Sequence, residues 1–248
     1  SYVANYALSL CEARGDCFYI MDLTQASQTI TGAVTQAALL DTNYAAAYYP
    51  WIRVLDTNTN KLVFVPPSVS LPEVYAYNDN VAAEWFAPAG LNRGGIPGAA
   101  GVKTRLAQAQ RDVLYEGKVN PIAQFPGQGI CVWGQKTLQI AASALDRVNV
   151  RRLLIEIRRQ VREIANSVIF EQNREATLAA FSAAVTPRLQ RIQALAGLER
   201  FRVIIDSSTT TQTDIENNTV RGKIFVQPTK SIEFVSLDFV VTNAGATI

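Results

Sequence analysis

The sequence predicts an α/β domain of the α+β kind, with a mixed sheet flanked by helices and a long helix pair followed by C-terminal β strands. Three observations predict this class. Helical and strand-like segments alternate from residue 1 to residue 133, two long helical stretches follow, and the region 201–241 switches to period-two alternation. This order fits a layered domain in which helices pack on a sheet. With 248 residues, 48% of them hydrophobic, the chain can bury such a core.

Helices and strands alternate through the first half of the chain. Helical spacing of apolar residues predicts helices, and runs of β-branched and aromatic residues predict strands. The predicted helices cover residues 1–14, 24–40, 70–80 and 105–115. The predicted strands cover residues 17–21, 44–55, 61–65, 119–125 and 129–133. Ser70 is expected to cap the third helix, with Pro72 in its first turn.

Turn-forming residues separate these segments. Residues 57–60 predict a hairpin turn, and Pro66-Pro67 stops the strand that follows it. The region 87–101 is rich in Gly and Pro and predicts a long loop. A loop of that length in a compact domain is usually functional or an interaction site.

The second half of the chain begins with the clearest element, a helix over residues 146–170. Its apolar face is formed by Val150, Leu153, Leu154, Ile157, Val161, Ile164, Ala165 and Val168. A second helical region, 174–195, is interrupted at Thr186-Pro187, which predicts either a kink or a new helix capped by Thr186, and Gly197 ends it. The remaining predictions are strands at 201–205, 223–226 and 232–241, a polar connection at 209–218 and an exposed tail at 242–248.

The composition excludes several classes of function. The chain has no histidine, which removes Ser-His-Asp and Cys-His catalysis and His-based zinc sites. A formal net charge of +2 does not indicate a nucleic-acid binder, and no apolar run is long enough for a membrane span. The three cysteines predict free thiols in a reducing compartment, because an odd, sparse set does not form a disulfide framework.

No motif for a cofactor or an enzyme emerges from the sequence. The glycines near residues 127–134 do not form a dinucleotide fingerprint, and those at 90–98 lack the ending of a phosphate loop. Glu156 and Glu163 each follow an arginine by four residues, Arg152 and Arg159, which predicts ordinary surface ion pairs. We therefore expect no cofactor, no metal and no enzymatic activity, with a hydrolase on an α/β fold as the weaker alternative.

Arginines gather on both long helices. Arg151, Arg158 and Arg162 form a stripe beside the apolar face of the first helix, without an acidic residue at four-residue spacing. Two interpretations stay open for this stripe: a solvated flank whose apolar stems cover the core edge, or contact with an acidic partner surface. The same choice applies to a second basic set around the other helix, Arg174, Arg188, Arg191, Arg200 and Arg202.

The last predicted strand alternates well and lies near the chain end. An edge strand offers unpaired backbone groups to another chain, and strand addition joins subunits in many assemblies. Pairing within the chain and pairing across subunits are both compatible with the sequence. The residues that would take part in strand exchange are Ile232, Phe234, Val235, Leu237, Phe239 and Val241.

A set of short sequences is distributed along nearly the whole chain. They are RGDCFYIMD at 14–22, YAAAYYPW at 44–51, VPPS at 65–68, APAGLN at 87–92, LYEGKVNPI at 114–122, GICVWGQKTL at 129–138, NVRRL at 149–153, FEQN at 170–173 and DI at 214–215. In this order they resemble the tail sheath proteins of contractile bacteriophages, a family shared with contractile bacteriocins and secretion systems. The matches are collinear, so their order is more specific than any one of them.

This resemblance implies a structural subunit of the virion tail, assembled in the host cytoplasm. Sheath subunits of this family stack as hexameric rings around the tail tube, and a baseplate signal triggers a contraction that drives the tube through the host envelope. The implied partners are further copies of the chain, the tube protein and baseplate proteins, with no direct contact to nucleic acid or membrane. The resemblance places the C-terminal part of the subunit next to the tube, with exchanged terminal strands between neighbours. The basic residues of the helical region are then expected to contact the tube.

The sequence departs from the family pattern at three places. Gln172 stands where the family often has proline, Thr186-Pro187 interrupts a helix that is usually unbroken, and the N-terminal arm is absent. We expect residues 1–248 to be an inner, C-terminal sheath domain from a longer chain, lacking that arm and upstream outer domains. Another structural tail or baseplate module, or a secretion-system sheath, is the alternative.

Overall fold

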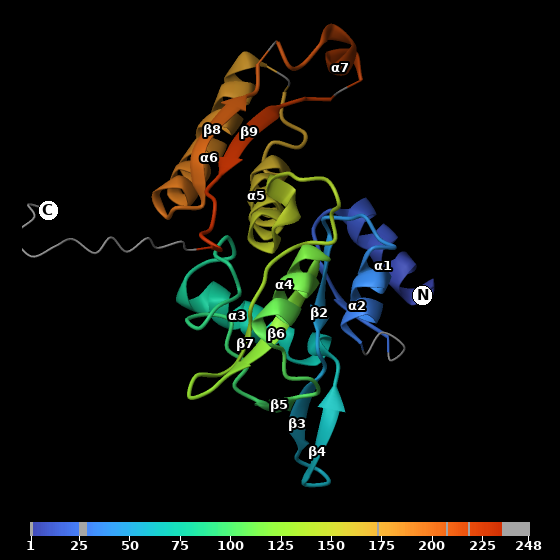
Figure 1. Cartoon of the computed structure of the whole chain (residues 1–248). Coiled ribbons are helices and arrows are strands. Elements are labelled where there is room, and N and C mark those ends of the chain that lie inside the picture. The colour runs from blue at the N-terminus through green and yellow to red at the C-terminus, as the bar shows by residue number, and fades with distance from the viewer. Residues whose placement is uncertain (1, 25–28, 173, 207, 218, 235–248) are drawn as a thin grey trace, which may run out of the picture.

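A computed structural model describes residues 2–24, 29–172, 174–206, 208–217 and 219–234. Figure 1 shows an α/β body with a small sheet at one end and a helical lobe at the other. The mixed α+β class with flanking helices is confirmed. No helix among these residues is long and apolar enough to cross a bilayer.

The body is built on a four-stranded mixed sheet in the order β1-β2-β6-β7. β1, β2 and β6 are parallel, and β7 runs antiparallel to β6. β2 lies in the middle and all five of its residues are buried, so Ala45 and Ala47 pack on one face and Ala46 and Tyr48 on the other. The strands are β1 (Tyr19–Asp22), β2 (Ala45–Tyr49), β6 (Val119–Phe125) and β7 (Gly129–Val132).

Helices cover both faces of this sheet. One face packs against α1, α2 and α4 through residues such as Leu8, Ala33 and Leu114, and the other packs against α3 through Leu71 and Val74. The helices are α1 (Tyr2–Arg14), α2 (Ile30–Ala37), η2 (Pro67–Val69), α3 (Leu71–Val81) and α4 (Gln108–Glu116).

One predicted helix start differs from the observed one, and one predicted capping bond is not made. The helix predicted from residue 24 begins at Ile30, because the Thr29 hydroxyl caps it by accepting a hydrogen bond from the Gly32 amide at 3.0 Å. Ser70 precedes α3 as predicted, with Pro72 in the first turn, but its side chain makes no capping hydrogen bond.

The predicted strand 44–55 is two strands in different sheets. The cis Tyr49–Pro50 peptide lies between β2 and β3, and β3 belongs to a second, antiparallel sheet in the order β4-β3-β5. Sequence periodicity did not indicate this break because both halves are rich in aromatic and β-branched residues. The second sheet comprises β3 (Ile52–Asp56), β4 (Lys61–Val65) and β5 (Ala99–Val102).

The C-terminal lobe has its own hydrophobic cluster. Leu153 and Ile157 of α5 pack against Val185 and Leu189 of α6, and the inner face of a two-stranded sheet closes the cluster. This confirms the predicted long helix pair followed by strands. Its elements are η3 (Ala144–Asp146), α5 (Val148–Asn166), α6 (Glu175–Ala194), β8 (Leu198–Ile204), α7 (Gln212–Glu216) and β9 (Lys223–Pro228).

Helix α6 runs through Pro187 without starting anew. The Thr186 hydroxyl donates to the Ser182 carbonyl one turn back, at 2.8 Å, so it does not act as a cap. The alternative of a second helix beginning at Thr186 is therefore wrong.

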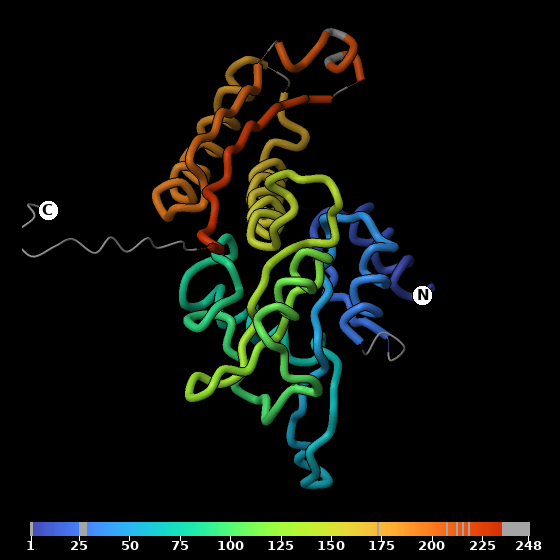
Figure 2. Tube along the Cα trace, viewed as in Figure 1, coloured from blue at the N-terminus to red at the C-terminus, as the bar shows by residue number. Residues whose placement is uncertain are grey.

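The last predicted strand falls partly outside the described residues. Residues 231–234 lie in no strand of this chain, although alternation predicted a strand from Ile232. Val235, Leu237, Phe239, Val241 and the predicted tail 242–248 lie outside the described part. Figure 2 shows the chain leaving β9 and returning toward the body before it ends in the grey trace.

The turn from α6 into β8 needs a residue without a side chain. A Cβ at Gly197 would lie 2.6 Å from Ile192 Cγ2 and 3.0 Å from Trp85 Cγ. We expect Gly197→Ala to lower the free energy of unfolding by about 1–3 kcal/mol, since a packed core resists added volume. Gly98→Ala is the control, because a Cβ there meets nothing within 4 Å, and it should change stability by less than about 0.5 kcal/mol. Equal effects of the two variants in urea unfolding would contradict this packing.

Candidate interaction surfaces

The arginine stripe of α5 contacts other parts of the same chain. The Arg151 guanidinium lies 4.1 Å from the Tyr44 ring centroid and donates to Asn43 Oδ1. Arg151 is only 8% exposed, and this burial lowers the pKa of its guanidinium. The contact ties α5 to the start of β2, so Arg151 is a packing residue of the fold and not an open docking group.

The other two arginines of the stripe reach the turn after α1. Arg158 Nη1 donates to the Gly15 carbonyl at 3.2 Å, and Arg162 Nη1 lies 3.7 Å from Asp16 Oδ2. Arg158 and Arg162 thus lie on an exposed flank, as the first interpretation expects, whereas the buried Arg151 does not. Arg162 keeps 58% of its side chain exposed. The acidic partner was missed because Asp16 is distant in sequence.

Further arginines connect the first turns of α5 to the body. Arg152 Nη2 contacts Asp79 Oδ2 at 2.5 Å and its guanidinium lies 4.7 Å from the Tyr75 ring centroid. The predicted Arg152–Glu156 pair is therefore wrong, because the side chain turns toward α3. The predicted Arg159–Glu163 pair is confirmed at 2.6 Å.

Helix α6 presents a different basic surface. Arg174, Arg188 and Arg191 are exposed, and none of them forms an ion pair with another described residue. Arg200 and Arg202 are exposed on β8 of the same lobe. This surface has the charge and the accessibility that an acidic partner requires.

The two-stranded sheet has open edges. β8 and β9 pair only with each other within the described part of the chain, so each strand has an edge without a ladder partner. Val203 and Val226 face the cluster of the lobe, whereas Phe225 is 55% exposed on the other face. Such edges are suited to strand addition by another chain.

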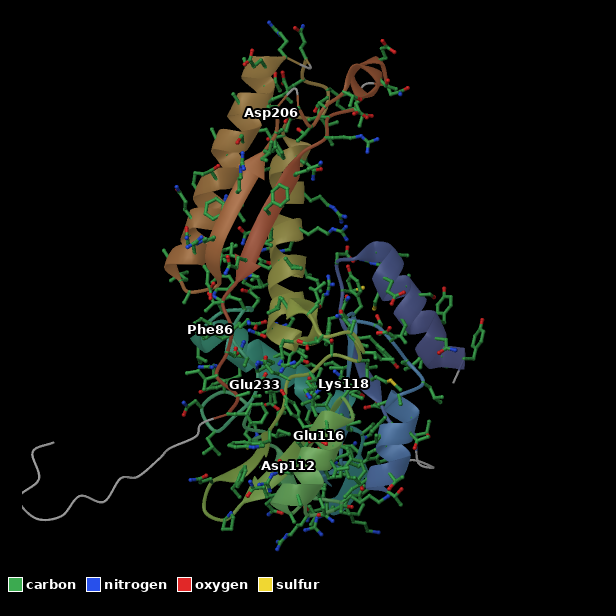
Figure 3. The ribbon with its side chains drawn as sticks, turned by 45° about the horizontal axis from the view of Figure 1, so that its top comes forward. Phe86, Asp112, Glu116, Lys118, Asp206 and Glu233 are labelled. Atoms are coloured by element: carbon green, nitrogen blue, oxygen red, sulfur yellow. The ribbon has the colours of Figure 1, made fainter. Side chains whose placement is uncertain are left out.

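The segment after β9 crosses a groove of about 530 Å³ between lobe and body. Phe86, Asp112 and Glu233 are three of the residues that line it (Figure 3). Glu233 Oε1 accepts from Arg147 Nε at 2.6 Å and from Gln135 Nε2 at 3.2 Å, and Oε2 accepts from the Tyr115 hydroxyl at 2.8 Å. Sequence analysis did not single out Glu233, although it is a lone charge in phase with Val235, Leu237 and Phe239.

These surfaces are of the kind by which proteins join other chains, and the described residues offer no metal site beside them. Within the described ranges no group of three His, Cys, Asp or Glu side chains could hold a metal ion. Cys11, Cys17 and Cys131 carry free thiols, and burial raises the pKa of Cys131 to about 11. A basic helix face and open strand edges are features of a protein that joins other chains.

The chain belongs to the phage tail sheath family. The phage tail sheath protein central domain matches residues 1–138, and the phage tail sheath C-terminal domain matches residues 141–242. The tail sheath protein of Vibrio phage KVP40 is 36% identical over 86% of this chain and 31% of its own length. That of Enterobacteria phage T4 is 30% identical over 99% of this chain and 40% of its own length. The chain thus spans about a third of the length of these relatives.

Solved sheath structures share the fold. The contracted sheath of an extracellular contractile injection system (PVC) matches with a TM-score of 0.79 and 28% identity, over 90% of this chain and 63% of that one. The contracted helical sheath of the anti-feeding prophage matches with a TM-score of 0.77 and 23% identity, over 94% of this chain and 64% of that one. The matched regions include both the body and the C-terminal lobe.

The arginines of α5 differ in how strongly they support the fold. We expect Arg151→Ala to lower the free energy of unfolding by about 2 kcal/mol, because it removes a charged hydrogen bond and a cation–π contact from a buried site. Arg162→Ala should cost less than about 0.5 kcal/mol, since its ion pair is long and exposed. Urea unfolding of both variants tests this order, and a reversed order would exclude Arg151 as a packing residue.

Proposed function

We propose that this chain is the tube-proximal part of a contractile tail sheath subunit. The subunit assembles as stacked hexameric rings around a tail tube and contracts to drive the tube through the host envelope. The observation that carries this proposal is the family match over both the body and the C-terminal lobe, joined to the likeness with a contracted sheath. The protein then belongs to the virion tail, with baseplate proteins at one end of the assembly.

The proposed role is mechanical and not catalytic. Contraction of such an assembly requires two packings of the same subunits that differ in free energy, and it consumes no nucleotide. The chain has no histidine, and so lacks the commonest general base near neutral pH.

We place the tube contact on the exposed arginines of α6. Arg174, Arg188 and Arg191 are free to bind acidic side chains, whereas Arg151 and Arg158 are engaged within the chain. Exposed ion pairs contribute modestly and weaken with salt. Several such pairs hold a sheath on its tube and still release it on contraction.

We place the contacts between subunits on the open edges of β8 and β9. A strand from a neighbour can extend this sheet by backbone hydrogen bonds. The segment that follows residue 234, with Val235, Leu237, Phe239 and Val241, has the alternation that such a strand needs. Arm exchange of this kind keeps each subunit linked to its neighbours while the rings rearrange during contraction.

A second candidate is a sheath of a non-phage contractile system. Two similar solved structures are the anti-feeding prophage baseplate and the sheath of an extracellular contractile injection system. The assembly chemistry is the same in both cases, so the two candidates differ in the associated tube and baseplate.

Electron microscopy of the full-length protein tests the assembly directly. We expect hollow, sheath-like tubes of stacked rings with six subunits in each ring. The protein should form them without nucleotide, since the proposal needs none. Strictly monomeric protein over a range of salt concentrations would contradict the proposal.

Charge reversal on α6 tests the tube contact. We expect Arg188→Glu and Arg191→Glu together to weaken binding to the tube at least tenfold, because attraction becomes repulsion at two exposed sites. The unfolding transition should not change, since neither side chain is buried.

Lys61→Glu is the control for this reversal. Lys61 is exposed at the start of β4, in the second sheet and outside the C-terminal lobe. It should leave tube binding, measured by co-sedimentation at two salt concentrations, unaltered. Unchanged binding of the Arg188/Arg191 variant would remove α6 from the interface.

A further inference from the structure

The first residues after β9 are fixed to the body of their own chain. Asn149 Nδ2 donates to Ser231 Oγ at 3.2 Å. Two residues later Glu233 receives three hydrogen bonds, and Phe234 then packs edge-on against Tyr115 with ring centroids 6.5 Å apart. The segment is thus held by its side chains even though it forms no strand.

The three donors to Glu233 come from three separate parts of the chain. Tyr115 lies in the last turn of α4, Gln135 follows β7, and Arg147 precedes α5. We name these three side chains the carboxylate clamp. Because they converge from different elements, the fold sets their position before the C-terminal segment arrives.

The clamp is also selective for a negative charge. Arg147 forms an ion pair with Glu233 in which the two side chains are 26% and 15% exposed. Burial opposes the charge on Arg147, yet the hydrogen bond to Glu233 holds the pKa of Arg147 above its usual value. Arg147 also forms an ion pair with Asp146 at 2.9 Å, so Glu233 is its second carboxylate partner. A carboxylate fits this site better than a neutral side chain, because it adds charge-assisted compensation for the partial burial of Arg147.

We propose that Glu233 anchors the C-terminal arm in its own subunit, so that exchange between subunits begins after Phe234. This inference rests on the proposed function and locates the point at which an arm leaves its subunit. Ile232 and Phe234 then belong to the anchored stem, in contrast to the expectation that they form part of the exchanged strand.

Chain length supports an anchor within the subunit. Glu233 follows the end of β9, Pro228, by five residues, which span at most roughly 18 Å when extended. A clamp on a neighbouring subunit could bind Glu233 only if it lay within this distance of Pro228. The clamp of the same chain lies within this distance and is occupied by Glu233.

A charge-swap experiment on the full-length protein distinguishes anchoring within a subunit from anchoring between subunits. The single variants are Glu233→Arg and Arg147→Glu, and each places like charges together. The double variant restores an opposite pair in one chain. Arg147→Glu also removes the ion pair of Arg147 with Asp146, and Glu233→Arg brings a guanidinium back to both carboxylates in the double variant. The new negative group lies at the N-terminus of α5, where it is favourable.

The expected result has three parts. Each single variant loses tube formation at least tenfold, the double variant recovers it, and a mixture of the two single variants does not. Recovery in the mixture would overturn the proposal, because a mixture offers opposite pairs only between chains. Normal tubes from both single variants would also overturn it. Tube formation by the wild-type protein must be shown first. If the wild-type protein forms no tubes, the proposed function is contradicted, and the anchor is tested by hydrogen exchange instead.

A second measurement covers the case in which a single variant does not fold. In the unassembled wild-type protein, amides of 229–234 should already be protected from hydrogen exchange. Glu233→Gln should increase their exchange at least tenfold, whereas Glu163→Gln, which weakens an exposed ion pair, should leave it unchanged. Protection that arises only on assembly would show that the segment binds a neighbour, and so would overturn the proposal.

Discussion

The first turns of α5 hold the structure together, because their arginines bind three separate parts of the chain. Arg147 contacts the C-terminal segment, Arg151 packs on Tyr44 at the start of β2, and Arg152 contacts α3. A guanidinium keeps its charge when buried and also stacks on aromatic rings. It can therefore join surfaces of mixed character, whereas leucine would remove the charged contacts to Asp79, Asn43 and Glu233. The three arginines lie within six consecutive residues, at the N-cap and in the first turns of α5.

This arrangement distinguishes the surfaces that are packed within the chain from those that remain open. The body is a sheet covered on both faces, and the inner face of the C-terminal lobe is closed by its own hydrophobic cluster. The groups that we propose for contact with other chains are the exposed arginines at α6 and the edges of β8 and β9. In a sheath subunit, a firm joint at α5 would transmit movement of the body to those surfaces. The anchored stem at Glu233 would fix where each arm starts.

Sequence patterns predicted the fold more completely than the interactions. Period and turn chemistry located most elements, because burial of one helical face or one strand face is a local requirement, but the sequence predicted a loop where β5 begins and a polar connection where α7 lies. They failed where a distant contact decides the outcome. Tyr44 to Leu55 reads as one strand, yet its two halves enter different sheets. Arg151, Arg158 and Arg162 form the predicted stripe, but their partners are distant in sequence. Arg174, Arg188 and Arg191 remain exposed, as surface positions on an amphipathic helix should.

The central claim is that α5 makes the body and the C-terminal lobe one cooperative unit. Native-state hydrogen exchange tests it directly, because segments that open together share one opening free energy. We expect three sets of amides to exchange with the same opening free energy and the same denaturant dependence. They are the amides of β2, of α5 from Val150 to Ile157 and of the buried part of α6. Exchange of α5 and α6 at a distinctly lower free energy, while β2 and β6 stay protected, would contradict it.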